Sequence, residues 1–277
     1  MALELNPEIE FVDSGSIVHF RSRRLYALGV GHLFTSRFNL IVGRKTDCDM
    51  GFKGGRDRDE IVACRAAACQ VAGSEISNLT VLHQVHSGHA VVVEADGVGR
   101  GGMSKEDVLA DADGMVTEEP GAALMILTAD CVPVLIFDPE GRVGALHAGW
   151  RGAVAGIARN TVALMMERFG SEPGRLIAVL GPAIRSCCFE VGDEVADEFA
   201  RAANEIGRTE QEFIAEIRGR AHVDLPGFVA ADLAAGLDRK NIIDSGLCTS
   251  CLKDYFYSYR RDGRLVGSHG AMIAIGG

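Results

Sequence analysis

The sequence predicts an α+β fold, a sandwich of sheets and helices in one domain over residues 1–277. Short apolar runs bounded by Gly, Pro and Asp recur through the middle of the chain, and runs of this length are typical of buried strands. Longer Ala-rich segments with helical spacing stand between and after them. Strands and helices mix without strict strand–helix alternation, which favours α+β over a parallel α/β fold.

The N-terminal half alternates between short strands and glycine-rich loops, with one helix. We expect an extended segment up to residue 26 with a strand at 17–21, and then a strand and polar loop over 28–39. A Gly- and charge-rich loop is expected over 43–59, followed by a helix over 60–73. Strand-like runs follow at 79–85 and 90–94, then a Gly-rich loop over 96–107, and a turn and strand over 111–117. Gly73 is a typical helix terminator.

The central stretch carries three apolar runs, at 122–127, 132–137 and 143–146. Polar residues of metal-binding or catalytic type stand at the ends of these runs: Asp130 and Cys131 after the first, and His147 and Arg151 after the third. The ends of buried strands are rigid and reach solvent, so chemistry can be held there. A further polar cluster, which runs from His83 to His89 and includes His86, lies just upstream.

The C-terminal half is predicted to be richer in helix. We expect helices over 153–169, 191–203, 209–217 and 226–237, and strands at 176–180, 242–244, 254–259 and 269–275. Gly170 would end the first helix, and Pro226 suits the first turn of the last.

Charge and composition exclude several classes of function. The formal net charge of −10 argues against nucleic acid or an anionic membrane as the main partner. An anionic small substrate stays possible, because a local arginine cluster can oppose the overall sign. No run approaches the roughly 20 apolar residues of a membrane span, and the acidic N-terminus lacks a secretory signal pattern. We therefore expect a cytoplasmic protein.

The eight cysteines are expected to be mostly free thiols, because the chain is long and shows no secretory signal. Cys248 and Cys251 form a single CxxC pair. A zinc ribbon needs a second such pair, which the sequence lacks, so structural zinc is not expected there. The adjacent Cys187 and Cys188 cannot easily bridge each other, and packing is the expected role.

Candidate chemistry centres on His86, Cys131 and His147. One thiolate and two imidazoles are good zinc ligands, and three protein ligands leave one tetrahedral position open, the pattern of a catalytic zinc site. Two alternatives remain open at this stage. Cys131 and His147 could be a metal-free nucleophile pair, or all three side chains could be packing residues. The zinc deaminase signature HxE with PCxxC is absent.

Several longer motifs occur in a fixed order and resemble those of the YfiH or laccase-domain family, formerly described as multicopper polyphenol oxidases and now as purine nucleoside phosphorylases. The motifs are His83–Ser87, Ala112–Gly114, Leu127–Val134, His147–Gly152, Gly181–Ile184, Cys187–Gly192 and Phe256–Gly263. The resemblance covers roughly residues 28–275.

The resemblance implies a four-layer α-β-β-α sandwich of mixed sheets flanked by helices. It places the metal ligands on His86, Cys131 and His147. It implies phosphorolysis of adenosine, inosine, guanosine and methylthioadenosine, with deamination of adenosine, so that purine nucleosides and phosphate would be the partners. The older name implies copper, but the chain lacks the HxH pairs of a multicopper cluster, so we rank zinc above copper.

Further residues can be given hypothetical roles. Arg37, Arg151 and Arg260 are candidates for holding phosphate, because guanidinium groups match phosphate oxygens; the alternative is surface ion pairs. Asp130 is a candidate proton-transfer group, and its alternative role is to orient a ligand histidine. A non-enzymatic scaffold that binds partners through the loops 43–59 and 96–107 is the remaining competing class.

Overall fold

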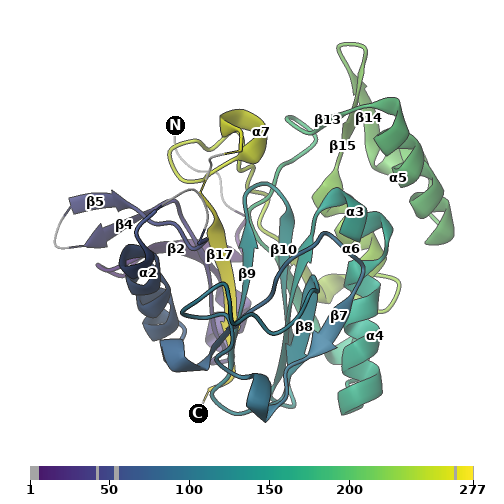
Figure 1. Ribbon diagram of the computed structural model, residues 1–277. Helices are drawn as coiled ribbons and strands as arrows, with labels where there is room; N and C mark the ends of the chain where they lie inside the picture. Colours follow the sequence, from purple (N-terminus) through teal and green to yellow (C-terminus); the bar gives the residue numbers. More distant parts are fainter. Residues whose placement is uncertain (1–5, 42–43, 53–55, 265–266, 277) are drawn as a thin grey trace.

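The computed structural model describes residues 6–41, 44–52, 56–264 and 267–276, and within them two large mixed sheets face each other (Figure 1). The first sheet contains six strands in the order β1 (Ile9–Asp13), β2 (Val18–Ser22), β3 (Gly31–Thr35), β17 (His269–Ala274), β9 (Ala123–Thr128) and β6 (Leu79–Val81). The second contains β16 (Ile242–Asp244), β12 (Ile177–Leu180), β10 (Val132–Asp138), β11 (Arg142–Ala148), β8 (Gly114–Thr117) and β7 (Ala90–Val92).

Two smaller sheets and seven α-helices complete the described part of the chain. The smaller sheets are β4 (Phe38–Ile41) with β5 (Arg44–Asp47), and β13 (Glu190–Val191) with β15 (Arg220–Val223) and β14 (Ile214–Ile217). The helices are α1 (Arg23–Ala27), α2 (Arg58–Val71), α3 (Trp150–Val154), α4 (Ile157–Phe169), α5 (Asp193–Glu205), α6 (Leu225–Leu233) and α7 (Tyr259–Asp262).

The alternation of side chains along the strands builds the layers. On β10, Val134 and Ile136 join the core under the helices, whereas Leu135 joins the core between the sheets. On β9, Leu124 faces the layer between the sheets and Met125 faces the opposite side, where α2 packs. Both faces of these central strands are therefore covered, which explains why they appear as continuous apolar runs in the sequence.

The four-layer α-β-β-α sandwich is thus confirmed. Helix α2 covers the first sheet, the two sheets pack together, and α4 and α6 cover the second sheet (Figure 1). The lobe with α5 and the β13–β15–β14 sheet projects beyond these layers at the upper right of the view. Among the described residues, no helix is both long and apolar enough to cross a membrane.

Most predicted elements are found within a few residues of their expected bounds, but three predictions were wrong. The helix expected over 153–169 is two helices, because Gly156 adopts a left-handed φ of 77° between α3 and α4. The helix expected over 209–217 is a short 3₁₀ turn followed by β14. The strand expected over 254–259 is a turn and coil that lead into α7.

The N-terminal region also departs from the expected loops. The extended segment up to residue 26 contains β1, β2 and most of the helix α1. Strand β5 lies within the predicted loop 43–59, although residues 43 and 53–55 of that loop fall outside the described part.

Candidate metal centre

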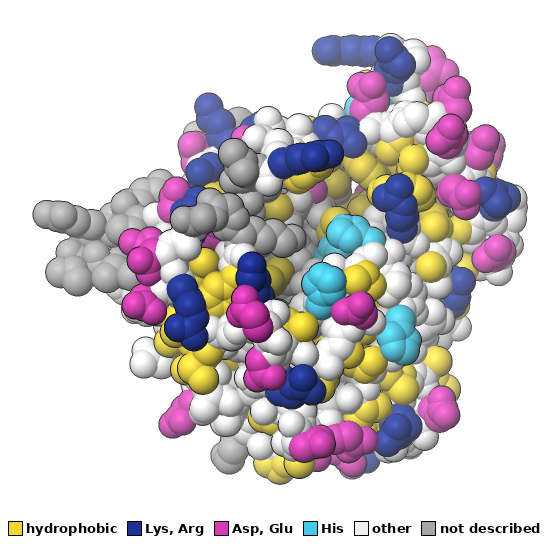
Figure 2. Space-filling view, viewed as in Figure 1, with side chains coloured by type: hydrophobic (Ala, Val, Ile, Leu, Met, Phe, Trp, Pro, Cys, Tyr) yellow, Lys and Arg dark blue, Asp and Glu magenta, His cyan; other side chains and the backbone are white. Residues whose placement is uncertain are grey.

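The three side chains that the sequence offers as candidate ligands come from separate segments and converge in the structure. One donor atom from each of His86, Cys131 and His147 lies within 4.8 Å of the other two. The Cys131 sulfur is 3.9 Å from Nε2 of His86, and the two imidazole rings are 4.7 Å apart at an angle of 84°. Histidine side chains gather near a hollow in this face of the molecule (Figure 2). We call these three residues the His–Cys–His trio.

The register between two strands brings Cys131 and His147 of the trio together. Strands β10 and β11 are antiparallel neighbours, and Pro133 pairs with His147. Cys131 immediately precedes β10 and has the same parity as Pro133, so its side chain meets that of His147 at the end of the hairpin. His86 comes from the loop after β6 and has a φ of 62°, a left-handed conformation that is uncommon for a residue with a Cβ.

Asp113 holds both the loop that carries His86 and the side chain of His147. Its carboxylate accepts hydrogen bonds from the backbone N–H groups of Val85, His86 and Ser87 and from the Ser87 hydroxyl. The Nδ1–H of His147 donates to the same carboxylate over 2.8 Å. This bond directs the Nε2 lone pair of His147 toward the trio, as a carboxylate behind a metal-binding histidine commonly does.

The charges around Asp113 keep it ionised despite complete burial. Burial alone would raise the pKa of its carboxyl group, but the bonds from His147 and the Ser87 backbone lower this pKa to about 2. At neutral pH Asp113 therefore faces the imidazole as a carboxylate.

Cys131 and His147 shift each other's protonation. Burial favours a neutral thiol, yet the adjacent His147 lowers the pKa of Cys131 to about 6. Burial also opposes a charged imidazole, but Cys131 and Asp113 raise the pKa of His147 to about 9. The site thus favours a thiolate beside a positive charge, and either a proton on His147 or a metal cation can supply that charge.

Glycine is required where the next turn approaches the trio. A Cβ on Gly149 would lie 2.6 Å from Cδ2 of His86 and 3.2 Å from the Cys131 sulfur. Any side chain at this position would displace His86 and Cys131, which explains the glycine at the start of α3.

Asp130 directs its carboxylate away from the trio. The strand β9 has already ended, and Asp130 has a φ of 102°. Its carboxylate accepts hydrogen bonds from the hydroxyls of Thr249 and Ser258 and from the backbone N–H of Arg260. Asp130 therefore ties the segment before Cys131 to the start of α7.

The three predicted arginines differ in their surroundings. Arg37 donates to the Lys253 carbonyl and lies over the Tyr257 ring at 4.8 Å. Arg260 donates to the carbonyls of Cys188 and Glu190. Arg151 is exposed, lies over the Trp150 ring at 4.2 Å, and has no carboxylate within ion-pair distance among the described residues.

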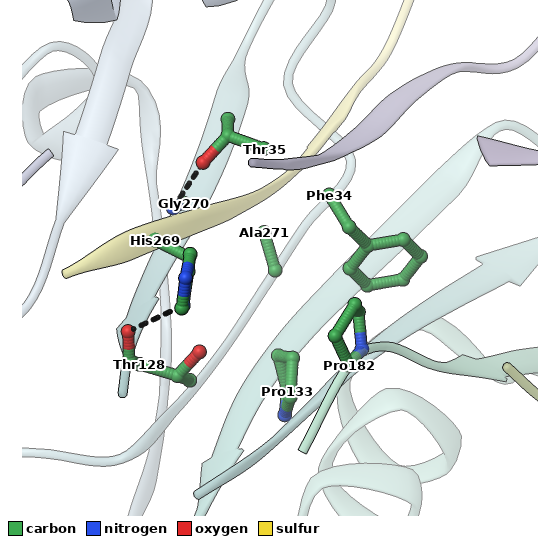
Figure 3. Close-up of a pocket in the computed structure, with 8 residues that line it drawn as sticks. All are labelled: Phe34, Thr35, Thr128, Pro133, Pro182, His269, Gly270 and Ala271. Atoms are coloured by element: carbon green, nitrogen blue, oxygen red, sulfur yellow. Dashed lines mark hydrogen bonds between the residues drawn. The ribbon is translucent and has the colours of Figure 1, made fainter. Parts of the chain in front are cut away.

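A small cavity between the two sheets is too confined for a substrate. It is lined by Phe34 and Ala271 on one side and by Pro133 and Pro182 on the other (Figure 3). Its volume of about 10 Å³ is near the least that one water needs. The neighbouring His269 donates from Nδ1 to the Thr128 carbonyl and accepts the Tyr257 N–H, and burial lowers its pKa to about 3. His269 is therefore a neutral side chain that packs in the interior.

Comparison with known proteins gives the family. A family model described as multi-copper polyphenol oxidoreductase laccase matches residues 31–276. The chain belongs to this laccase family. A purine nucleoside phosphorylase of Deinococcus radiodurans is 36% identical over 250 residues, which are 90% of each chain.

Two further proteins match this chain over most of their length. Adenosine deaminase RL5, from an unknown prokaryotic organism, is 35% identical over 211 residues, or 76% of this chain and 79% of that one. The crystal structure of YlmD from Geobacillus stearothermophilus has a TM-score of 0.86 and 27% identity, and the match covers 98% of this chain and 100% of that one. This chain therefore shares its fold with YlmD over nearly its whole length. The two relatives matched by sequence are named as enzymes.

Asp113 could not be recognised as a site residue from the sequence, although it lies in the motif Ala112–Gly114. A signal was present: Leu146 pairs with Gly114 between β11 and β8, so the residue that precedes β8 lies opposite His147. An aspartate one residue before a strand is a weak signal unless that register is given.

Proposed function

We propose that the protein is a zinc-dependent purine nucleoside phosphorylase that also deaminates adenosine. Its substrates would be adenosine, inosine, guanosine and methylthioadenosine, with phosphate as the second substrate. The observation that carries the proposal is the His–Cys–His trio, in which Asp113 orients one ligand and no protein group fills a fourth position in the described part of the chain. The names of the Deinococcus phosphorylase and the deaminase RL5 support the choice of reactions.

The donor set supports zinc over copper. One thiolate and two imidazoles with one open position match a catalytic zinc site. The copper in the family's description would need clusters of several histidines for multicopper oxidase chemistry, and the described residues offer only the trio and a group of four cysteines. A bound zinc ion would supply a Lewis acid at the mouth of the site.

The chain's own residues then have distinct roles. His86, Cys131 and His147 would hold the ion, and the ionised Asp113 would fix His147. In phosphorolysis a phosphate oxygen forms a bond to the ribose C1′, while the bond from C1′ to the purine nitrogen breaks and its electron pair leaves with the base. Holding phosphate in line for this attack needs cationic donors.

Arg151 is the best-placed of the three phosphate candidates. Its guanidinium group is exposed and lacks a carboxylate partner among the described residues, and it follows the ligand His147 at the start of α3. Arg37 and Arg260 are already bonded to carbonyl groups, so they keep fewer donors for a substrate. We assign Asp130 the role of holding the Cys131 segment against α7.

The test is incubation of the purified protein with adenosine and phosphate. We expect adenine and ribose 1-phosphate, together with inosine, and both activities should disappear on chelation and return with zinc. Cys131→Ser should reduce both by at least about 100-fold, since even residues behind a metal ligand cost 10–100-fold. His83→Gln is the control, because His83 is exposed in the loop that carries His86 and pairs with Asp111.

Formation of none of these products by zinc-loaded wild-type protein would exclude the enzyme proposed here. The absence of disulfides among the eight cysteines suits a reducing compartment, so we place the enzyme in the cytoplasm.

One specific observation favours a second candidate, a metal-free hydrolase. Cys131, with its pKa lowered to about 6, and His147, with its pKa raised to about 9, have the charges of a thiolate–imidazolium nucleophile pair. Alkylation separates the two functions. Rapid modification of Cys131 in the active protein supports the nucleophile, whereas protection of Cys131 by zinc supports a ligand role.

A further inference from the structure

Four cysteines that are separate in sequence meet in a second cluster. The turn after β12 contributes Cys187 and Cys188, and the loop after β16 contributes Cys248 and Cys251. One sulfur from each lies within 4.8 Å of all the others. We call this group the four-cysteine cluster.

The spacing of the sulfurs is that of a coordination shell. Cys187 is 3.7 Å from Cys188, 3.6 Å from Cys248 and 3.6 Å from Cys251, and Cys188 is 3.4 Å from Cys251. In a tetrahedral site with zinc–sulfur bonds of about 2.3 Å, two sulfurs are about 3.8 Å apart. A disulfide bond would need about 2.05 Å. The observed spacing thus fits four sulfurs around one ion.

Backbone hydrogen bonds hold the two loops in this arrangement. Ala183 and Cys248 form a parallel β-bridge, in which the Thr249 N–H donates to the Ala183 carbonyl. On the other loop, the Cys188 N–H donates to the Arg185 carbonyl and forms the turn that brings the adjacent cysteines to one side.

Two arginines belong to the loops that carry the cluster, and each is also paired with an aspartate. The guanidinium group of Arg185, two residues before Cys187, is fixed by two bonds to Asp244. Arg261 donates to the carbonyls of Thr249 and Ser250, inside the CxxC loop. Cys187 and Cys251 are exposed, so an ion can enter from solvent.

We propose that the four-cysteine cluster is a structural site for a thiophilic divalent cation, with zinc the best fit. Four protein ligands fill the tetrahedron, so this site would have no open position for a substrate. The bound ion would join the loop after β12 to the loop before α7. This corrects the expectation that the CxxC pair lacks partners: the fold supplies the second pair from the adjacent cysteines.

The cluster is also connected to the His–Cys–His trio. Thr249, next to Cys248, donates to Asp130, which is next to Cys131. Arg260 donates to the Cys188 carbonyl from the start of α7. An ion in the cluster would therefore stabilise the segment that positions Cys131 and the candidate substrate ligand Arg260.

The experiment is a zinc determination on the purified full-length protein and on variants at each site. Since two groups of ligands exist, we expect about two zinc ions per chain in the wild type. Cys251→Ser should lose one of them, Cys131→Ser should lose the other, and the double variant should lose both. Cys251 is exposed, so the serine is expected to be tolerated by the fold. Cys69→Ala, at a buried cysteine outside both groups, is the matched control and should keep both ions.

A second measurement covers the case in which Cys251→Ser fails to fold. Cobalt-substituted wild-type protein should show the absorption of a tetrathiolate site in addition to that of a site with mixed ligands, and zinc-edge X-ray absorption should show more sulfur than the trio can supply. The thermal midpoint of Cys251→Ser should also fall by several degrees, because metal binding stabilises the folded state.

Three results would overturn the site: zinc content that Cys251→Ser leaves unchanged, cobalt spectra without a tetrathiolate component, or cysteines that resist alkylation until a reductant is added. The last result would show a disulfide in place of a metal. All three readouts are independent of nucleoside turnover, so the site and the proposed activity can fail separately.

Discussion

Asp113 and Asp130 are both buried aspartates close to a candidate metal ligand, yet their carboxylates bind different parts of the protein. Asp113 faces five hydrogen-bond donors, one of which is the candidate ligand His147. Asp130 is adjacent in sequence to Cys131, but its three donors belong to the segment around α7. The difference teaches that strand register, rather than adjacency in sequence, decides which carboxylate touches the trio.

The largest expected effect comes from Asp113→Asn. Every partner of Asp113 donates, so the new NH₂ group must face a donor whichever way the amide is turned. We expect a loss of about 3 kcal/mol in the free energy of unfolding, and a loss of 10–100-fold in zinc affinity. Urea unfolding and competition with a chelator measure the two quantities. Zinc affinity equal to that of the wild type would contradict the role of Asp113.

The decrease in the free energy of unfolding at acidic pH should also depend on Asp113. The pKa of Asp113 is lowered from 3.8 to about 2 in the folded protein, so its contribution is fully present above about pH 4. It is lost as the pH falls through about 2, and its size is about 2–3 kcal/mol. Unfolding of the metal-free protein at successive pH values should show this loss in the wild type. Asp113→Asn should show a flatter acid limb, and equal slopes would exclude the assignment.

Removal of one partner of Asp113 should have a smaller effect. Ser87→Ala deletes the hydroxyl that donates to Oδ2 over 2.8 Å but keeps the three backbone donors and His147. We expect a loss of about 1 kcal/mol in stability, with zinc content unchanged in the purified protein. Loss of zinc from this variant would mean that the loop is held less firmly than its hydrogen bonds indicate.

The smallest effect is expected for Asp130→Asn, the matched contrast to Asp113→Asn. Two of the partners of Asp130 are hydroxyls, which can rotate and accept a hydrogen bond from the new NH₂ group, while the amide oxygen accepts the Arg260 N–H. We expect a change of less than about 1 kcal/mol, and zinc affinity like that of the wild type. A large loss of turnover with the zinc retained would instead support Asp130 as a proton-transfer group.

The strands of the central stretch could be predicted from sequence because each is buried on both faces. The runs at 122–127, 132–137 and 143–146 became β9, β10 and β11 with shifts of at most two residues. The three ligand types could also be found, because a thiol and imidazoles next to strand ends are by themselves a sign of metal binding. Their convergence could only come from tertiary structure.

The wrong elements have local physical causes. The segment 209–217 has helical composition, but Arg218 and Gly219 both adopt positive φ, at 56° and 73°, and turn the chain from β14 into β15. Such a two-residue turn matches the twist of a hairpin, and Arg-Gly is a much weaker signal for it than Asn-Gly. Gly156 interrupts the helix pattern in the same way, through a left-handed φ that the spacing of apolar residues does not reveal.

The origin of the three ligands has a consequence for assembly. Cys131 and His147 belong to one hairpin, whose strands are close in sequence and can pair early. His86 arrives on a separate loop, which is held to that hairpin through Asp113. In the proposed metal site, the hairpin would therefore supply one sulfur and one imidazole first, and docking of the loop would add the second imidazole. Changes to the loop should then slow this second step and leave the first unchanged.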